Sequence, residues 1–169
     1  TWSQLDLVDA RALDVGWGFL APDGTRPFAG KGFCVSTFAE ILDAFPDIQI
    51  NVDIKQSPVE AVLELIKAKH AEDRVTVASF QTGPAIAVRR KGYGGATALS
   101  QGEVLSLVSL PALLWRQLPF TGTAAQVPTH HRVMRFDRPA FIAKCHSLGL
   151  RIDFWTIDDP DEKRARELE

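Results

Sequence analysis

Segments with strand-like and helix-like patterns alternate along most of this 169-residue chain, and this alternation constrains its fold more than any other feature. Runs of apolar and β-branched residues predict five strands, at residues 48–54, 74–80, 94–99, 123–127 and 151–157. Helical patterns follow them, at residues 58–70, 83–91, 102–118, 138–148 and 160–168. Alternating strands and helices joined by short loops predict an α/β fold with a parallel sheet covered by helices.

Local signals mark where several of these helices begin and end. A further helix at residues 36–45 has Ser36 as its expected N-cap and Glu40 in its first turns. The helix at 102–118 is expected to break near Pro111, and Gly149 is placed to end the helix at 138–148. Pro160 suits the first turn of the last helix.

The first 35 residues form an irregular, glycine-rich lead-in to the regular part of the chain. Gly16 and Gly18 have no third glycine at the spacing of a dinucleotide loop and no strand before them, so a nucleotide site is not expected there. We therefore predict a single domain over residues 1–169, with the lead-in at 1–35 and the βα units at 36–169.

The composition, 46% hydrophobic and 24% charged, is that of a globular protein with a real core. A net charge of −2 gives no basic field for nucleic acid. No apolar run approaches the roughly 18 residues of a membrane span. No signal peptide is visible, which favours the cytoplasm. Cys34 and Cys145 are predicted to be buried and reduced.

The strand at 48–54 carries the most informative pattern. Ile50, Val52 and their apolar neighbours share one face, whereas Asn51, Asp53 and Lys55 share the other. A parallel strand buried on both faces would read as a continuous apolar run. A barrel strand with helices outside and a polar site at its mouth explains the pattern, whereas a solvated edge strand is the simpler alternative.

Asp53 and Lys55 stand two residues apart, so they share a face at the C-terminal end of the predicted strand. In that arrangement Asp53 suits a divalent cation such as Mg²⁺ or Ca²⁺, because these cations prefer oxygen ligands. Lys55 would then meet a substrate phosphate. The alternative is an ordinary surface pair of opposite charges.

A second candidate is the strand at 151–157, where Asp153 and Trp155 share a face. Trp155 would form either an apolar wall for a small ligand or part of the core. Asp158 and Asp159, before a proline, are more simply helix caps than metal ligands. The other charged or titratable candidates are not expected to form a site. His70 and His146 are expected to be structural or surface residues, and the pair His130–His131 to be surface residues. The basic run at 89–91 is expected to be a solvated helix end.

These segments together resemble the glycerophosphodiester phosphodiesterases. The residues that carry the resemblance are Asn51-Val52-Asp53-Ile54-Lys55, Ser79-Phe80, Ala125-Gln126-Val127-Pro128 and Phe154-Trp155-Thr156-Ile157-Asp158. The lead-in and the stretch at 143–149 resemble the family as well, so the likeness runs in order over nearly the whole chain.

The resemblance implies a (β/α)8 barrel, present here as an incomplete barrel of about strands 3 to 7. It also implies hydrolysis of glycerophosphodiesters to glycerol 3-phosphate and an alcohol with a divalent cation, Ca²⁺ or Mg²⁺, within lipid and glycerol metabolism. By motif position, Asp53 would be a metal ligand, Lys55 would be the catalytic contact to the phosphate, Trp155 would pack on the glycerol moiety and Gln126 would face the pocket.

Three motifs of the family do not occur in this sequence: the two that carry its acid–base histidines and a Glu-x-Asp metal pair. The family's usual glutamate at the metal position is Asp53 here, and its asparagine after Trp-Thr is Asp158. We therefore expect the 169 residues alone to be inactive. Alternative readings are a related barrel phosphodiesterase for another lipid headgroup, a non-catalytic binding module with the same barrel, and an unrelated α/β domain.

Overall fold

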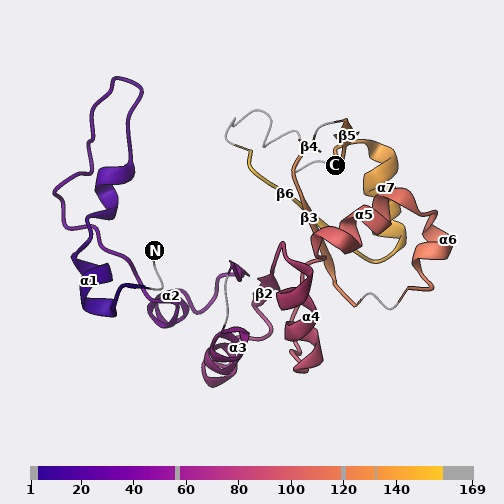
Figure 1. Ribbon diagram of the computed structural model, residues 1–169, viewed down its shortest axis with the longest axis horizontal. Coiled ribbons are helices and arrows are strands. Elements are labelled where there is room, and N and C mark those ends of the chain that lie inside the picture. The colour runs from indigo at the N-terminus through magenta and orange to yellow at the C-terminus, as the bar shows by residue number, and fades with distance from the viewer. Residues whose placement is uncertain (1–3, 56–57, 119–120, 132, 158–169) are drawn as a thin grey trace. The chain divides into compact units, whose positions relative to one another are not determined.

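A computed structural model of the protein describes residues 4–55, 58–118, 121–131 and 133–157 (Figure 1). The chain divides into two compact units, Thr1–Pro46 and Asp47–Glu169. No helix within the described residues is long and apolar enough to span a bilayer.

The first unit contains more regular structure than its glycine content predicts. Helix α1 (Leu7–Ala12) and a short 3₁₀ turn, η2 (Val15–Gly18), lie in the stretch expected to be irregular. The side chains of Asp6 and Asp14 cap these two turns by accepting backbone N–H groups, which explains how such short elements form.

Helix α2 (Phe38–Ala44) has its N-cap one residue later than expected, so the prediction of Ser36 as its cap is wrong. The cap is Thr37, whose hydroxyl accepts from the backbone N–H of Glu40 at 3.2 Å. The Glu40 carboxylate accepts in return from the N–H of Thr37 at 2.8 Å. This reciprocal pair is a capping box, and only a residue three positions before Glu40 can form it.

The second unit is built on parallel strands. Strand β1 (Ile50–Asp53) pairs with β2 (Val75–Ala78), and β3 (Ala124–Val127) pairs with β6 (Arg151–Phe154). Single bridges from Val77 to Thr97 and from Ala98 to Ala124 join the two pairs through the segment predicted as the strand at 94–99. The five segments therefore lie side by side in chain order, as in a barrel wall; a doubly wound sheet would reverse its order.

Helices fill the connections between these strands, as the alternation predicts (Figure 1). They are α3 (Val59–Ala68), α4 (Thr82–Arg90), α5 (Gln101–Ser109), α6 (Ala112–Trp115) and α7 (Pro139–Ser147). The expected break at Pro111 separates α5 from α6, and Gly149 adopts a φ of 74° after α7. The predicted helix at 160–168 lies outside the described residues.

The small antiparallel hairpin of β4 (His130–His131) and β5 (Met134–Arg135) is a further element that the sequence does not predict. Both histidines are exposed on it, in agreement with their expected place at the surface. The hairpin follows β3 and precedes α7, so it occupies the loop that sequence reasoning left without structure.

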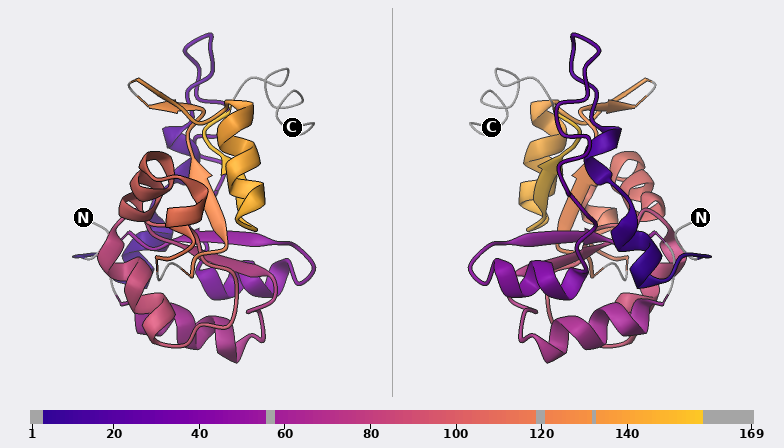
Figure 2. Two further views of the ribbon diagram at one scale, coloured as in Figure 1. Left: turned by 90° about the vertical axis from the view of Figure 1, so that its right-hand side faces the viewer. Right: turned by 90° about the vertical axis from the view of Figure 1, so that its left-hand side faces the viewer.

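The core lies on the face of the sheet that the helices cover. Figure 2 shows α7 alongside the β3–β6 pair. There Ala125 of β3 and Cys145 of α7 pack with four more buried residues, Leu99, Leu107, Trp115 and Leu150. Both cysteines are free, as expected, and Cys145 is buried. The predicted burial of Cys34 is wrong, since that residue is exposed.

The opposite face of the sheet is polar and curved. Asn51 on β1 donates to Gln126 on β3 at 3.3 Å, and Arg151 on β6 donates to Thr76 on β2 at 3.2 Å. In a flat sheet β1 and β3 would stand about 14 Å apart, at about 4.8 Å per strand spacing. Two amide side chains bridge that separation only if the sheet bends around them. The polar face is therefore concave, as inside a barrel.

Candidate functional site

An open cleft with a volume of about 800 Å³ lies at the C-terminal ends of the parallel strands. The strand order explains its position, because all five segments are parallel and end at the same edge. Every site residue predicted from the sequence lines this cleft: Asp53, Lys55, Gln126 and Trp155. These four residues span more than a hundred positions of sequence, and the fold brings them to one place.

Asp53 and Lys55 form an ion pair at the rim of the cleft. The side chain of Lys55 is 78% exposed and that of Asp53 is 36% exposed. An exposed pair of this kind contributes at most about 1 kcal/mol, since water screens it. Both charges therefore remain available to a ligand: the ammonium to an anion and the carboxylate to a cation.

Gln126 lies deeper in the cleft and joins three strands. Its amide nitrogen Nε2 donates to Asp153 Oδ2 at 3.1 Å, and its oxygen Oε1 accepts from Asn51 at 3.3 Å. Arg151 holds Asp153 from the other side, with Nε 2.9 Å from Oδ1 and Nη2 2.9 Å from Oδ2. The inner face of the sheet thus carries a continuous polar network below the ion pair.

Two aromatic side chains supply apolar surface at the mouth of the cleft. Trp155, directly after β6, is 48% exposed, and Phe80, after β2, is 59% exposed. Such exposure places Trp155 at a wall of the cleft rather than in the core. A half-exposed indole beside polar groups suits packing against the carbon atoms of a small polar ligand.

The oxygen atoms of the cleft suit a hard divalent cation in kind. Asp53 offers a carboxylate at the rim, and Asp153, Asn51 and Gln126 offer further oxygens below it. Among the described residues, however, no group of three or more His, Cys, Asp or Glu side chains could hold a metal ion. Asp53 is therefore a candidate ligand, whereas the described residues do not form a complete metal site.

Sequence reasoning missed Phe80, Arg151 and the network that Arg151 anchors. For Arg151 a signal was present, because it alternates with Asp153 and Trp155 and so shares their face. For Phe80 the sequence pattern predicted only the end of a strand and no place in a site. Ser79 beside it is buried and donates to the carbonyl oxygen of Ile54 at 3.0 Å, so its hydroxyl is occupied.

None of the described residues lining the cleft is a histidine. His70 ends the segment after α3 with a φ of 48°, His146 lies in α7, and His130 and His131 form β4. The prediction that these are structural or surface residues agrees with their positions.

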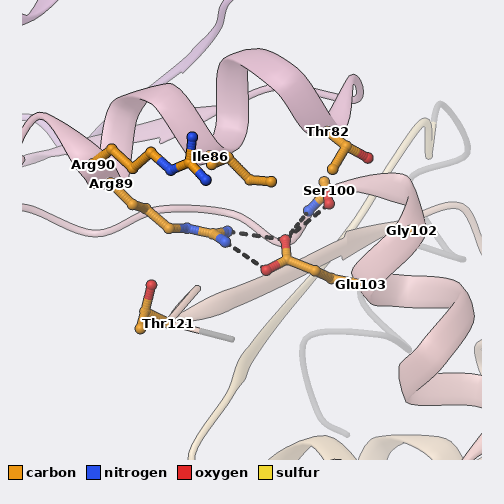
Figure 3. A pocket seen from close by; sticks show the side chains of 8 residues that line it. All are labelled: Thr82, Ile86, Arg89, Arg90, Ser100, Gly102, Glu103 and Thr121. Carbon is orange, nitrogen blue, oxygen red and sulfur yellow. Dashed lines mark hydrogen bonds and ion pairs between the residues drawn. The ribbon is translucent and has the colours of Figure 1, made fainter. Parts of the chain in front are cut away.

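A second cavity, of about 470 Å³, lies between α4 and the start of α5 (Figure 3). Arg89 donates there to both carboxylate oxygens of Glu103, at 2.5 and 3.1 Å, and Glu103 accepts from Ser100. The expectation that Arg89 is solvated is wrong, because the guanidinium folds back under the helix to this buried carboxylate. The ion pair ties α4 to α5.

The cleft and strand order define an α/β protein of the TIM-barrel type with a polar site at the strand C-termini. No family model matches the sequence. Among characterised proteins, the chain is similar to the probable glycerophosphodiester phosphodiesterase 2 of Mycobacterium tuberculosis (strain ATCC 25618 / H37Rv). The two are 29% identical over an alignment of 139 residues, and the match covers 78% of this chain and 52% of the relative.

Two solved structures share the fold. A putative glycerophosphoryl diester phosphodiesterase from Silicibacter pomeroyi matches with a TM-score of 0.61 and 21% identity over 81% of this chain and 51% of that one. A glycerophosphodiester phosphodiesterase from Parabacteroides distasonis matches with a TM-score of 0.54 and 16% identity, over 76% and 52%.

The resemblance found in the motifs is thereby confirmed, because the sequence relative and both of these solved structures carry names of glycerophosphodiester phosphodiesterases. The chain spans about half the length of the relatives that it matches. The fold is TIM-barrel-like, as predicted.

Proposed function

We propose that this chain forms the substrate-binding half of a metal-dependent phosphodiester hydrolase that cleaves glycerophosphodiesters to glycerol 3-phosphate and an alcohol. The observation that carries the proposal is the meeting of Asp53, Lys55, Gln126 and Trp155 in one cleft at the strand ends. The names of the relatives give the same class of reaction, and this supports glycerophosphodiesters as the substrate class.

In this proposal Lys55 is the catalytic contact. Its exposed ammonium turns from Asp53 to a phosphate oxygen and stabilises the negative charge that builds up as the ester bond breaks. Asp53 is a ligand of the cation, Ca²⁺ or Mg²⁺, which when bound supplies further positive charge at the phosphate. Trp155 packs against the glycerol carbons, and Gln126 binds a polar group of the substrate.

The 169 residues on their own bind substrate but do not turn it over. The resemblance assigns proton transfer to two histidines whose motifs do not occur in this sequence. No histidine lies among the described residues of the cleft. The complete (β/α)8 barrel and its acid–base residues belong to the same proposal.

The test is release of glycerol 3-phosphate from glycerophosphocholine, measured for this chain and for any longer gene product that contains it. We expect no turnover by the chain alone, and turnover by the longer protein that EDTA abolishes and Ca²⁺ or Mg²⁺ restores. In that protein Asp53→Ala should lower kcat at least tenfold. Turnover by the chain alone would refute its inactivity, and a cyclic phosphate product would favour a phosphodiesterase for another headgroup.

A further inference from the structure

A series of four hydrogen-bonded side chains crosses the floor of the cleft, and the order of donors and acceptors along it is fixed. It runs from Arg151 to Asp153 on β6, then to Gln126 on β3 and Asn51 on β1. The separations along it are 2.9 Å, 3.1 Å and 3.3 Å. Arg151 also donates to Thr76 on β2, so the series is anchored on the far side of the concave face.

A single carboxylate sets the orientation of both amides. An ionised Asp153 only accepts hydrogen bonds, so Gln126 must turn its NH₂ group toward it. The carbonyl oxygen of Gln126 then faces Asn51, which must in turn present its own NH₂ group. The order of donors and acceptors thus follows from the chemistry of Asp153.

At the end of the series, Asn51 presents an acceptor that has no donor among the described residues. With Nδ2 of Asn51 committed to Gln126, its oxygen Oδ1 is left for something else, and no described residue donates to it. Asn51 lines the cleft and is exposed there. It lies on the same face of β1 as Asp53, about 7 Å deeper along the strand at about 3.3 Å per residue, and Lys55 follows two residues after β1 ends.

We propose that Asp153, held by Arg151, is a positioning residue that makes Asn51 present its carbonyl oxygen to a hydroxyl of the ligand. The ligand class is a polyol phosphate, with its phosphate near Lys55 at the rim and a hydroxyl donating to Asn51 at the floor. This inference rests on the proposed function, because the phosphate-bearing ligand comes from it.

The test compares two probes: glycerol 3-phosphate, whose hydroxyls donate, and its O-methylated analogue, which only accepts. Calorimetry with the wild-type chain should give about tenfold tighter binding of glycerol 3-phosphate, the range of one net hydrogen bond. In D153N the Arg151 guanidinium still binds the side-chain oxygen at position 153, so the amide nitrogen of that side chain faces Gln126. Gln126 and Asn51 then both reverse their amide groups, and Asn51 presents Nδ2 to the cleft. The preference should then fall below about twofold.

The exchange variant D153N/N51D is the matched control, because it has the same composition and charge as the wild type. The carboxylate that this variant carries at position 51 accepts from Gln126 in its reversed orientation and again offers an oxygen to the cleft. The preference should therefore return to about tenfold. A preference unchanged in D153N, or not restored in the exchange variant, would overturn the proposal.

A second measurement needs no ligand. When Asp153 is present, N51D should lower the urea midpoint of unfolding, because the introduced carboxylate faces the Gln126 oxygen. In the D153N background, N51D should lower that midpoint much less. In a Gln126→Ala background the two positions should act independently. An equal effect of N51D in both backgrounds would refute the oriented series.

Failure of the wild type to bind either phosphate would instead refute the proposed function, and equal binding of both would refute only this inference.

Discussion

Tyr93 shows how burial acts on a single ionisable side chain of this protein. Its hydroxyl donates to the carbonyl oxygen of Val75 on β2 at 2.7 Å. Burial raises the pKa of Tyr93 to about 12, and the negative charges of Glu72 and Asp73 add to the shift. The phenol is therefore held protonated in the folded chain well above the pH at which a free phenol ionises.

This pKa predicts a loss of stability in alkali. The unfolded chain releases the phenolic proton near pH 10, whereas the folded chain keeps it to about pH 12. The contribution of Tyr93 is thus complete below pH 10 and disappears as the pH rises toward 12. Tyr93 is the only tyrosine of the chain, so absorbance at 295 nm follows it directly. The titration of the absorbance should have its midpoint near pH 12, and a midpoint near pH 10 would contradict the burial of Tyr93. The Tyr93→Phe variant supplies the background absorbance.

At the scale of elements, most of the helices and strands could be predicted, because each depends on neighbours in sequence. The break at Pro111 and the turn at Gly149 are examples. Elements that depend on a capping side chain were missed or shifted, as with α1 and the Thr37 cap of α2. The hairpin of β4 and β5 was missed because strands of two residues carry no periodicity.

The contact between α4 and α5 could not be foreseen either, and it yields a prediction. Glu103 is 6% exposed and bound by Arg89, so Glu103→Ala leaves a largely buried guanidinium without its ionic partner. The free energy of unfolding should fall by about 3 kcal/mol. Glu60, which pairs with Lys91 between α3 and α4 and is 55% exposed, is the matched control.

For Glu60→Ala the loss should be much smaller, because water screens an exposed ion pair. Urea unfolding of both variants measures the difference, and Glu103→Gln, which keeps the volume and part of the hydrogen bonding, should lie between them. Equal small losses for Glu60 and Glu103 would mean that the Arg89–Glu103 pair does not hold the two helices together.

At the scale of the whole molecule, the alternating polar and apolar faces of residues 48–55 predicted both the barrel-like sheet and the site at its mouth. The pattern could assign Asp53 and Lys55 to one face because they are two residues apart. It could not predict that Asn51 meets Gln126, 75 residues away, since that contact depends on how strongly the sheet curves. The same curvature brings Arg151 to Thr76 and creates the network.

We propose that the cleft at the strand ends binds a phosphate ester through Lys55. Calorimetric titration of the chain with glycerol 3-phosphate in the presence of Ca²⁺ tests it most directly. The wild type should bind. Lys55→Met should weaken binding about 10- to 100-fold, the range of one charge-assisted hydrogen bond. Lys67→Met, at an exposed lysine of α3 outside the cleft, should leave it unchanged. Equal affinity for the Lys55→Met variant and the wild type, or no binding by the wild type, would contradict the account.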